Sequence, residues 1–333
     1  MSKPRPLVLI FALALLVSML FGISLASGRA VLPLFELLAG SAADADGTLW
    51  LILTSIRLPR AVLAVLVGAS LGMAGAALQG YLRNPLAEPA LIGASSTAAL
   101  GAVLVLYSGL SGTFALALPL GGMLGAAAGM ALVAMLGGRD SVLGLILAGV
   151  AINSLAGALT SLALNLAPSP FASLEIAFWL LGSLADRSAD HVWVALPFMV
   201  LGCGLLLTLA RTLDALALGE ETAASMGFNL HRARLVMVLG CGLVVGACVA
   251  VSGVVGFVGL VVPHLLRPLV GNRPGALLLP AALGGAALVL AADIAARALS
   301  GSGGELKLGV VTALVGAPFF LRLLVQLRGQ FTS

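Results

Sequence analysis

Residue types that could carry out catalysis are few in this chain and widely scattered. Its two lysines, Lys3 and Lys307, lie outside any G-x-x-x-x-G-K-[S/T] sequence, the loop that holds the phosphates of ATP. The three histidines, His191, His231 and His264, fall on different segments. The three cysteines show no Cys-x-x-Cys or Cys/His spacing, so neither a disulfide framework nor a zinc site is expected. The residues therefore predict a chain that is not an enzyme and that binds no metal or cofactor itself.

A short polar segment within the loop at about 212–233 is better suited to binding a protein. Two adjacent glutamates favour the first turn of a short helix, and a glycine on either side can open and close that helix. Small apolar side chains between them would fit a groove on a partner. A helix lying on the lipid surface is the alternative, but such helices are usually longer and rich in Lys and Arg. The residues of this predicted docking helix are Leu218, Gly219, Glu220, Glu221, Ala224, Met226 and Gly227.

Arginines mark the opposite side of the predicted membrane domain. Arg57 and Arg60 begin one apolar run, and Arg297 ends another. They could bind the carboxylates of an external protein, giving it orientation and fast encounter, or they could anchor to lipid headgroups. Asp293 lies four residues before Arg297, which also allows a local ion pair on one helix.

The elements that carry these residues are apolar runs of about one bilayer thickness. Hydrophobic residues make up 61% of the 333 residues and charged residues 9%, so we expect a polytopic membrane protein. Its fold class is all-α, with about ten membrane-spanning helices in a single domain, 1–333. The arginines form no dense basic stripe, so nucleic acid is not an expected partner. The first run resembles a signal peptide but is interpreted as an uncleaved span. The ten runs lie near 7–26, 61–80, 92–108, 114–136, 142–166, 191–210, 234–252, 254–269, 276–296 and 308–327.

The distribution of Lys and Arg between the loops predicts the orientation of the chain. With an inside start, eleven of these residues fall on the inner side and six on the outer side. Short cytoplasmic loops carry the excess of positive charge, so both termini are predicted to be cytoplasmic. The apolar segment 171–184 is too short to cross and is expected to form a surface or re-entrant helix.

Glycines spaced four residues apart predict close packing of the helices. Gly121, Gly125 and Gly129 form two consecutive G-x-x-x-G steps, and Gly68/Gly72 and Gly242/Gly246 form two more. Small residues at this spacing let helix backbones approach each other in lipid.

Over essentially its whole length the chain resembles the FecCD family, the permease subunits of bacterial ABC importers for ferric siderophores, haem and vitamin B12. Many motifs in the right order carry this resemblance, which makes it stronger than any single one. They are Arg57-Leu-Pro-Arg60, the stretch from Gln79 to Pro89, Leu147-Ala-Gly-Val-Ala151, Leu218-Gly-Glu-Glu221, the stretch from Gly256 to His264, Ala292-Asp-Ile-Ala-Ala-Arg297, and the stretch from Glu305 to Phe319.

The resemblance implies a homodimer in the bacterial inner membrane, with a path for the substrate along the two-fold axis. It also implies two cytoplasmic ATPase subunits, which would bind ATP and Mg, and a periplasmic substrate-binding protein. The segment around Glu220 to Gly227 would be the coupling helix on the ATPase, and Arg57, Arg60 and Arg297 would receive the binding protein. Asn84 and Leu86 match an inner gate, and Ser141 and Val142 fall at a second gate position, where their types depart from the pattern. Ala151, Asn153, Ser154, Ala158 and Ser161 would line the path.

Two other functions are weighed against this interpretation. A secondary carrier driven by an ion gradient would need an acidic residue in mid-membrane, and the acids here fall at the ends of the runs. A scaffold or receptor without transport would not need a docking helix on one side together with arginines at the opposite mouth. The identity of the chelate, iron-siderophore, haem or cobalamin, is left open by the residues.

Overall fold

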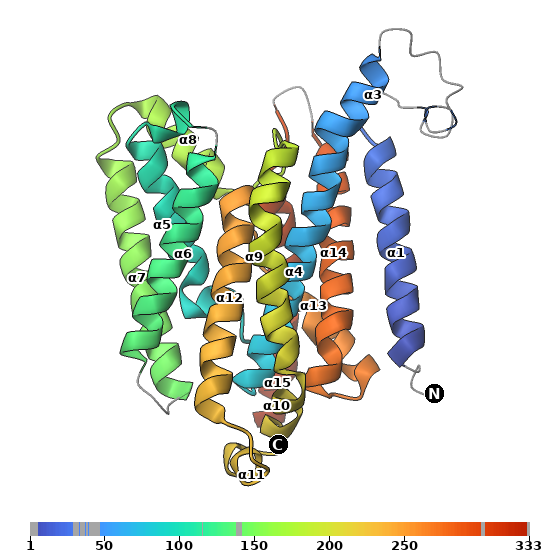
Figure 1. Ribbon diagram of the computed structural model, residues 1–333, viewed down its shortest axis with the longest axis vertical. Coiled ribbons are helices and arrows are strands. Elements are labelled where there is room, and N and C mark those ends of the chain that lie inside the picture. The colour runs from blue at the N-terminus through green and yellow to red at the C-terminus, as the bar shows by residue number, and fades with distance from the viewer. Residues whose placement is uncertain are drawn as a thin grey trace.

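Long apolar runs form the long helices of this protein, because a helix satisfies its own backbone hydrogen bonds where lipid cannot. A computed structural model describes residues 6–28, 47–114, 116–137, 142–300 and 304–331, together with positions 33, 37 and 39. Figure 1 shows the helices packed side by side, roughly parallel to one axis. The helices are α1 (Pro6–Ala26), α3 (Thr48–Ile52), the π-helical turn η1 (Leu53–Arg57), α4 (Leu58–Tyr81), η2 (Pro89–Ile92), α5 (Ala94–Tyr107), η3 (Leu110–Gly112), α6 (Ala117–Leu136), α7 (Val142–Asn165), α8 (Pro170–Leu180), α9 (Ala189–Thr208), α10 (Ala210–Leu216), α11 (Glu220–Ser225), α12 (Leu230–Ser252), α13 (Val258–Leu266), η4 (Arg267–Val270), α14 (Pro274–Ala298) and α15 (Leu308–Phe331).

The all-helical, multi-pass fold predicted from the sequence is confirmed. Each of the ten predicted spans overlaps a helix, whereas the number of helices that cross the membrane and the cytoplasmic placement of both termini stay predictions. Within the described residues, seven helices are long and apolar enough to cross a membrane: α1, α4 with its preceding turns, α6, α7, α9, α12 and α14. The apolar stretches of α5, α8, α13 with η4, and α15 are shorter. The predicted segment 171–184 is one of these, the short helix α8.

Two of the shorter helices, α5 and α13, begin directly after backbone that cannot be α-helical. Pro85 and Pro89 lie in the stretch before α5, and each lacks the amide proton that a helix interior needs. Gly93 then has a left-handed φ of 77° as α5 starts. Before α13, Gly253 and Phe257 have φ of 68° and 66°. These interruptions place irregular backbone inside the bundle, where protein rather than lipid surrounds it.

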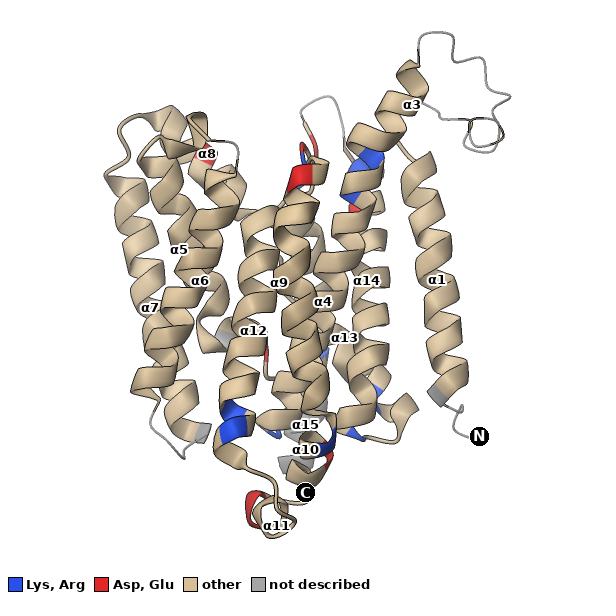
Figure 2. Ribbon diagram, viewed as in Figure 1, with Lys and Arg blue, Asp and Glu red and all other residues tan. Residues whose placement is uncertain are grey.

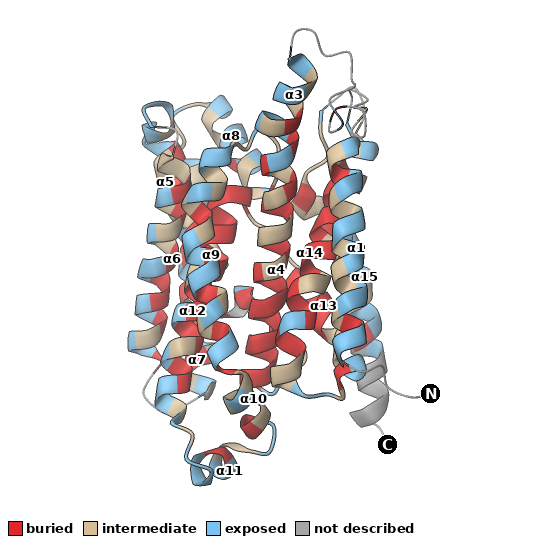
Figure 3. Ribbon diagram, turned by 45° about the vertical axis from the view of Figure 1, so that its right-hand side comes forward, coloured by how far each residue is buried: buried red, intermediate tan, exposed pale blue. Residues whose placement is uncertain are grey.

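Glycines allow the closest helix contacts, as their spacing predicted. A Cβ added to Gly68 would lie 2.3 Å from the carbonyl oxygen of Gly285, so α4 and α14 touch backbone to backbone. Gly125 meets the backbone of α5 in the same way, with 2.2 Å to the carbonyl oxygen of Thr97. A Cβ added to Gly246 on α12 would lie 2.5 Å from the Cβ of Ala126 on α6. Figure 3 shows the result, a buried centre around α4, α12, α13 and α14 with exposed faces outward.

Charged residues gather at the two ends of the bundle (Figure 2). The start of α1 lies at the same end of the molecule as α10 and α11 (Figure 1). We call this the inner end, and we call the opposite end, which carries α3 and α8, the outer end.

Candidate functional site

The predicted docking helix is present as α11, which projects beyond the inner end of the bundle (Figure 1). Gly219 precedes it with a φ of 114°, and Gly227 follows it with a φ of 86°, so glycine opens and closes the segment as predicted. Ala223 is fully buried against the bundle. Leu218 and Met226 are 67% and 58% exposed, and both glutamates lie in the first turn. The segment therefore exposes apolar side chains beside acidic ones on the surface of the inner end.

Two ion pairs connect this segment to the helices above. Glu220 on α11 accepts a hydrogen bond of 3.1 Å from Arg83, and both side chains are close to half exposed. Asp214 on α10 accepts bonds from the Arg273 side chain, at 2.7 Å, and from the backbone of Gly275, at 2.8 Å. A displacement of α10 and α11 would therefore pull on the start of α14 and on the loop that follows α4.

That loop contains the first predicted gate. Arg83, with a φ of 50°, is followed by Asn84, whose side-chain oxygen accepts a bond of 2.9 Å from the amide of Leu86. This local turn holds the two residues together at the inner end of α4. Ser141 lies outside the described residues, and Val142 is the first residue of α7, so the second gate position stays a prediction.

Deeper in the bundle, the same loop and the last turns of α4 are bonded to the residues at the start and end of α13. Glu88 accepts a hydrogen bond of 2.7 Å from the amide of Phe257, whose left-handed backbone is unusual for a bulky residue. Gln79 donates to the carbonyl of Gly259, at 3.2 Å, and accepts from Arg267, at 2.6 Å. These partners could not be predicted from the sequence, because they are 169 to 188 residues apart along the chain.

The predicted path residues share one face of α7. Ala151, Asn153, Ser154, Ala158 and Ser161 are all exposed, whereas Ile152 and Ala156 are buried against the bundle. Ser154 donates to the carbonyl of Val150, at 2.9 Å. An amide and two hydroxyls in the middle of an apolar helix are unfavourable in lipid. This face is thus chemically suited to water or to another protein surface.

At the outer end, Arg60 is the centre of a buried ion-pair cluster. Its guanidinium contacts both carboxylate oxygens of Asp293 on α14, with the shortest distance 2.8 Å. It also bonds to Glu305 in the segment before α15, with one distance of 3.1 Å. Asp293 is completely buried, and it pairs with Arg297 at 3.2 Å, as the four-residue spacing allowed. The cluster joins α4, α14 and the approach to α15.

The other two outer arginines bind the end of α1. Arg57 donates two bonds of 2.7 Å, to the carbonyls of Leu25 and Ala26. Arg297 donates to the carbonyls of Ser24 and Ser27, at 3.0 and 2.8 Å, and to the Ser24 hydroxyl. The last carbonyls of a helix have no partner within it, and cationic side chains satisfy them well.

All three arginines are therefore engaged within the chain. Arg57 is 6% exposed, and the side chains of Arg60 and Arg297 are 12% and 13% exposed. Their guanidinium groups already have partners within the chain. Their role in docking an external protein stays a prediction.

Other residues that could suggest catalysis or metal binding have structural roles. Gly68-Ala-Ser-Leu-Gly72 has the spacing of a hydrolase nucleophile elbow, but it lies in the middle of α4 with Ser70 buried, not at a strand-to-helix turn. Within the described part of the chain, no group of three His, Cys, Asp or Glu side chains could hold a metal ion. Cys241 and Cys248 are buried free thiols in α12.

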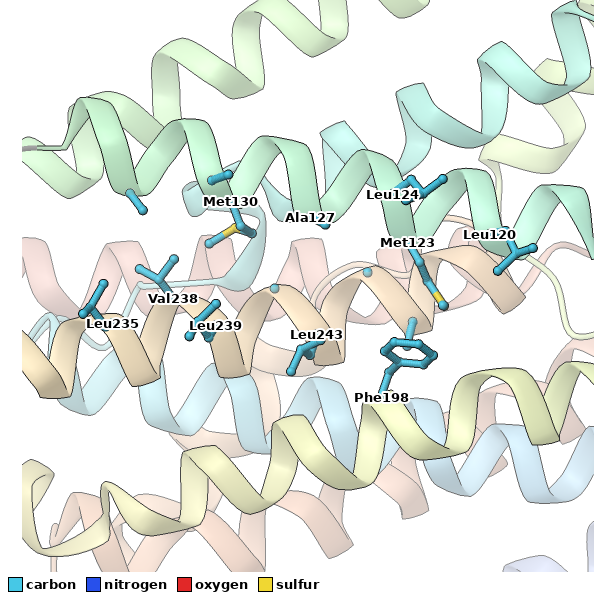
Figure 4. Close-up of a pocket in the computed structure, with 15 residues that line it drawn as sticks. Leu120, Met123, Leu124, Ala127, Met130, Phe198, Leu235, Val238, Leu239 and Leu243 are labelled. Carbon is cyan, nitrogen blue, oxygen red and sulfur yellow. The ribbon is translucent and has the colours of Figure 1, made fainter.

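Two apolar hollows lie along the helices. One, of about 430 Å³, has α12 as its floor and α6 and α9 as its walls (Figure 4). Its lining side chains, among them Met123, Leu124, Phe198 and Leu239, offer no hydrogen bond to a polar ligand. The second, of about 640 Å³, lies between α8, residues 254–257 and α15. Neither resembles a binding site for a hydrophilic molecule.

Comparison with known proteins gives consistent matches over nearly the whole chain. The sequence profile of the FecCD transport family matches residues 14–326. The hemin transport system permease protein HmuU of Yersinia pestis is 40% identical, with 98% of each chain covered. The vitamin B12 import system permease protein BtuC of Klebsiella pneumoniae is 37% identical, covering 96% of this chain and 94% of that protein. A solved structure of a metal-chelate type ABC transporter in an inward-facing conformation matches with a TM-score of 0.85 and 35% identity, over 97% of this chain and 100% of that one.

Proposed function

Because the chain belongs to the FecCD transport family, we propose that it is the membrane-spanning permease subunit of a type II ABC importer. Its cargo would be a metal chelate, namely an iron-siderophore, haem or cobalamin, carried across the bacterial inner membrane. Relatives named for hemin and vitamin B12 transport support this class of cargo. The partners would be a second copy of the chain, two cytoplasmic ATPase subunits that bind ATP and Mg, and a periplasmic substrate-binding protein.

The observation that carries the proposal is the exposed α11 at the inner end. A short helix that is held by one exposed ion pair and shows Leu218 and Met226 outward is suited to seating in a groove of another protein. The sequence has no nucleotide-binding loop. A separate ATPase would supply both the groove and the energy.

The polar face of α7 supports a path between two copies of the chain. Asn153, Ser154 and Ser161 are exposed in a single chain, and a second copy could enclose a hydrated passage along this face. The path would contact a bulky chelate through small side chains such as Ala151 and Ala158, and the periplasmic protein would select the cargo.

Transport would then proceed by alternating access. ATP binding draws the two ATPases together and displaces α11. The Arg83–Glu220 and Arg273–Asp214 pairs transmit that displacement to the loop with Asn84 and Leu86 and to α14. Each step must favour one state through a difference in binding free energy, because a ligand that binds both states equally shifts neither.

An ion-gradient-driven carrier acting alone is the alternative, and a reconstitution separates the two. The purified chain is placed in liposomes with haem, a ferric siderophore or cobalamin offered in turn, with an imposed proton or sodium gradient. We expect no uptake until the ATPase, the binding protein and ATP are added. Uptake by the chain alone would overturn the proposal.

The coupling role of α11 needs its own test. Replacing Glu220 and Glu221 by Lys should abolish the stimulation of ATP hydrolysis by loaded binding protein. The matched control is Glu175→Lys, which reverses an exposed acid on α8 at the outer end and should leave stimulation intact. Full stimulation in the Glu220/Glu221 variant would show that α11 is not the coupling element.

A further inference from the structure

A small pocket at the inner end lies between the end of α13 and the second half of α15. Its volume is about 260 Å³, and its lining is partly cationic and partly apolar. The His264 ring packs edge-on against Phe319, with ring centroids 5.6 Å apart. The lining residues are His264, Leu265, Pro268, Phe319, Arg322 and Leu323.

Hydrogen-bonding groups beside this pocket are left without partners. The Nδ1 atom of His264 and the Nε atom of Arg267 are both buried and make no hydrogen bond. Arg267 uses another nitrogen to bind Gln79. In the part of the chain that the structure describes, no carboxylate pairs with Arg267 or Arg322. Buried polar groups without a partner are rare in native proteins, so each of these two atoms is expected to meet a partner such as a water molecule, an ion or a ligand.

Stabilisation of α13 alone does not account for this arrangement. Basic residues near the C-terminus of a helix interact favourably with its dipole, which explains why His264 and Arg267 stand there. That interaction gives no reason for an exposed Arg322 on a different helix to face the same pocket.

The pocket has the depth and the mixed chemistry of a lipid headgroup site. Arg322 lies fourteen residues after the start of α15, or about 21 Å along the helix in a hydrocarbon core about 30 Å thick. Its backbone is thus about 9 Å short of the inner surface of that core, and its long side chain can extend to the headgroups. The start of α15 is at the outer end, where Lys307 lies over the Phe178 ring of α8. Leu265 is an exposed apolar side chain that lines the pocket together with Phe319, beside the cationic groups. A soluble anion would gain nothing from these apolar side chains, whereas an acyl chain would.

We propose that this pocket binds the phosphate of an anionic phospholipid from the leaflet at the inner end, with Arg322 and His264 as the donors. Basic pockets between membrane helices on the cytoplasmic side are suited to such headgroups. The inference uses the proposed function only to name that leaflet as cytoplasmic. The acyl chains would lie along Leu265 and Phe319.

Native mass spectrometry of the purified full chain tests the site without any transport step. Phosphatidylglycerol is titrated against phosphatidylcholine, and we expect preferential binding of phosphatidylglycerol. Arg322→Gln should weaken that binding about fivefold, the effect of one basic residue near an anionic surface. Arg322→Lys should retain most of it. Arg211→Gln, which removes an exposed arginine on α10, is the matched control and should change nothing.

Three outcomes would overturn the proposal. One is equal binding of phosphatidylglycerol by the Arg322→Gln variant and the unmodified chain. A second is an equal loss with Arg211→Gln, which would indicate general attraction to positive charge. The third is displacement of the lipid by millimolar inorganic phosphate, which would indicate a site for soluble anions such as the cargo. None of these results depends on whether the chain transports a chelate, so failure here is distinct from failure of the proposed function.

Discussion

The outer and inner ends of this protein both carry charged residues, but they use them in opposite ways. At the outer end, Arg57, Arg60 and Arg297 are largely buried, and their guanidinium groups are bonded within the chain. At the inner end, Glu220 and Glu221 stand on a projecting helix, with one exposed ion pair between them and the bundle. Charge at the end of a span therefore indicates neither docking nor stability until the partners of that charge are known.

The physical reason is the cost of removing a charge from water. A buried ion must have its hydrogen bonds satisfied, so losing one partner leaves the other uncompensated. An exposed pair is hydrated in either state and contributes little to stability. The outer cluster should therefore govern stability, and the inner segment should govern coupling.

The largest loss is expected for Arg60→Met, which leaves the fully buried Asp293 facing Arg297 alone. Breaking a buried pair by removing one partner costs about 3–5 kcal/mol. Thermal denaturation in detergent should show a clearly lower midpoint. Adding Asp293→Leu to the Arg60→Met variant should restore part of the lost denaturation midpoint, because it removes the uncompensated buried carboxylate. An unchanged midpoint for Arg60→Met would mean that the cluster is not a stabilising element.

A smaller and local loss is expected for the Arg57→Gln and Arg297→Gln variants. Each change weakens the charged hydrogen bonds to the end of α1. Because glutamine still has an NH₂ donor, we expect each variant to lose in total about the contribution of one such bond, about 1.5–3 kcal/mol. Hydrogen exchange should accelerate in the last turn of α1 and stay unchanged in α12.

These two variants also sharpen the question of docking at the outer end. If the affinity for the binding protein falls while the exchange of α1 is unaffected, the arginines contact the partner directly. If both change together, the arginines act by holding α1 in place.

The third effect appears only in acid. Burial raises the pKa of Glu305, but the hydrogen bond and charge of Arg60 outweigh it, so the net pKa lies below the usual 4.5. A carboxyl group whose pKa is lowered by folding stabilises the protein at any pH above the group's unfolded-state pKa. That stabilisation is lost as the pH falls through the folded-state pKa. The midpoint difference between the unmodified chain and Glu305→Gln should be constant from pH 7 to 5 and shrink below about 4.5. A constant difference at every pH would contradict this.

The smallest change in stability is expected for Arg83→Gln. Its pair with Glu220 is exposed, so the loss should be at most about 1 kcal/mol. Coupling should suffer more, because this pair links α11 to the loop with Asn84. A large fall in the denaturation midpoint with normal stimulation of ATP hydrolysis would reverse the roles assigned to the two ends.

Much of this architecture could be predicted from local sequence. The first run, 7–26, corresponds to α1 at Pro6–Ala26, and the run 142–166 corresponds to α7 at Val142–Asn165. Such agreement arises because hydrophobic length and the positions of Gly and Pro act locally. The prediction of one span over 254–269 was less accurate, since residues 254–257 precede α13, which begins after the left-handed Phe257, and residues 267–269 lie in the 3-10 turn η4.

The amino-acid sequence alone therefore determined which segments are helices, where the glycine contacts fall, and that a short acidic helix stands apart at one end. Only the tertiary structure decided what the charges do. Arg60 meets Asp293 across 233 residues of chain, and Arg57 meets Leu25 at the end of α1 across 32 residues. Burial, which sets the strength of a charge interaction, arises from helices packed around each other and leaves no trace in the spacing of residues along one helix.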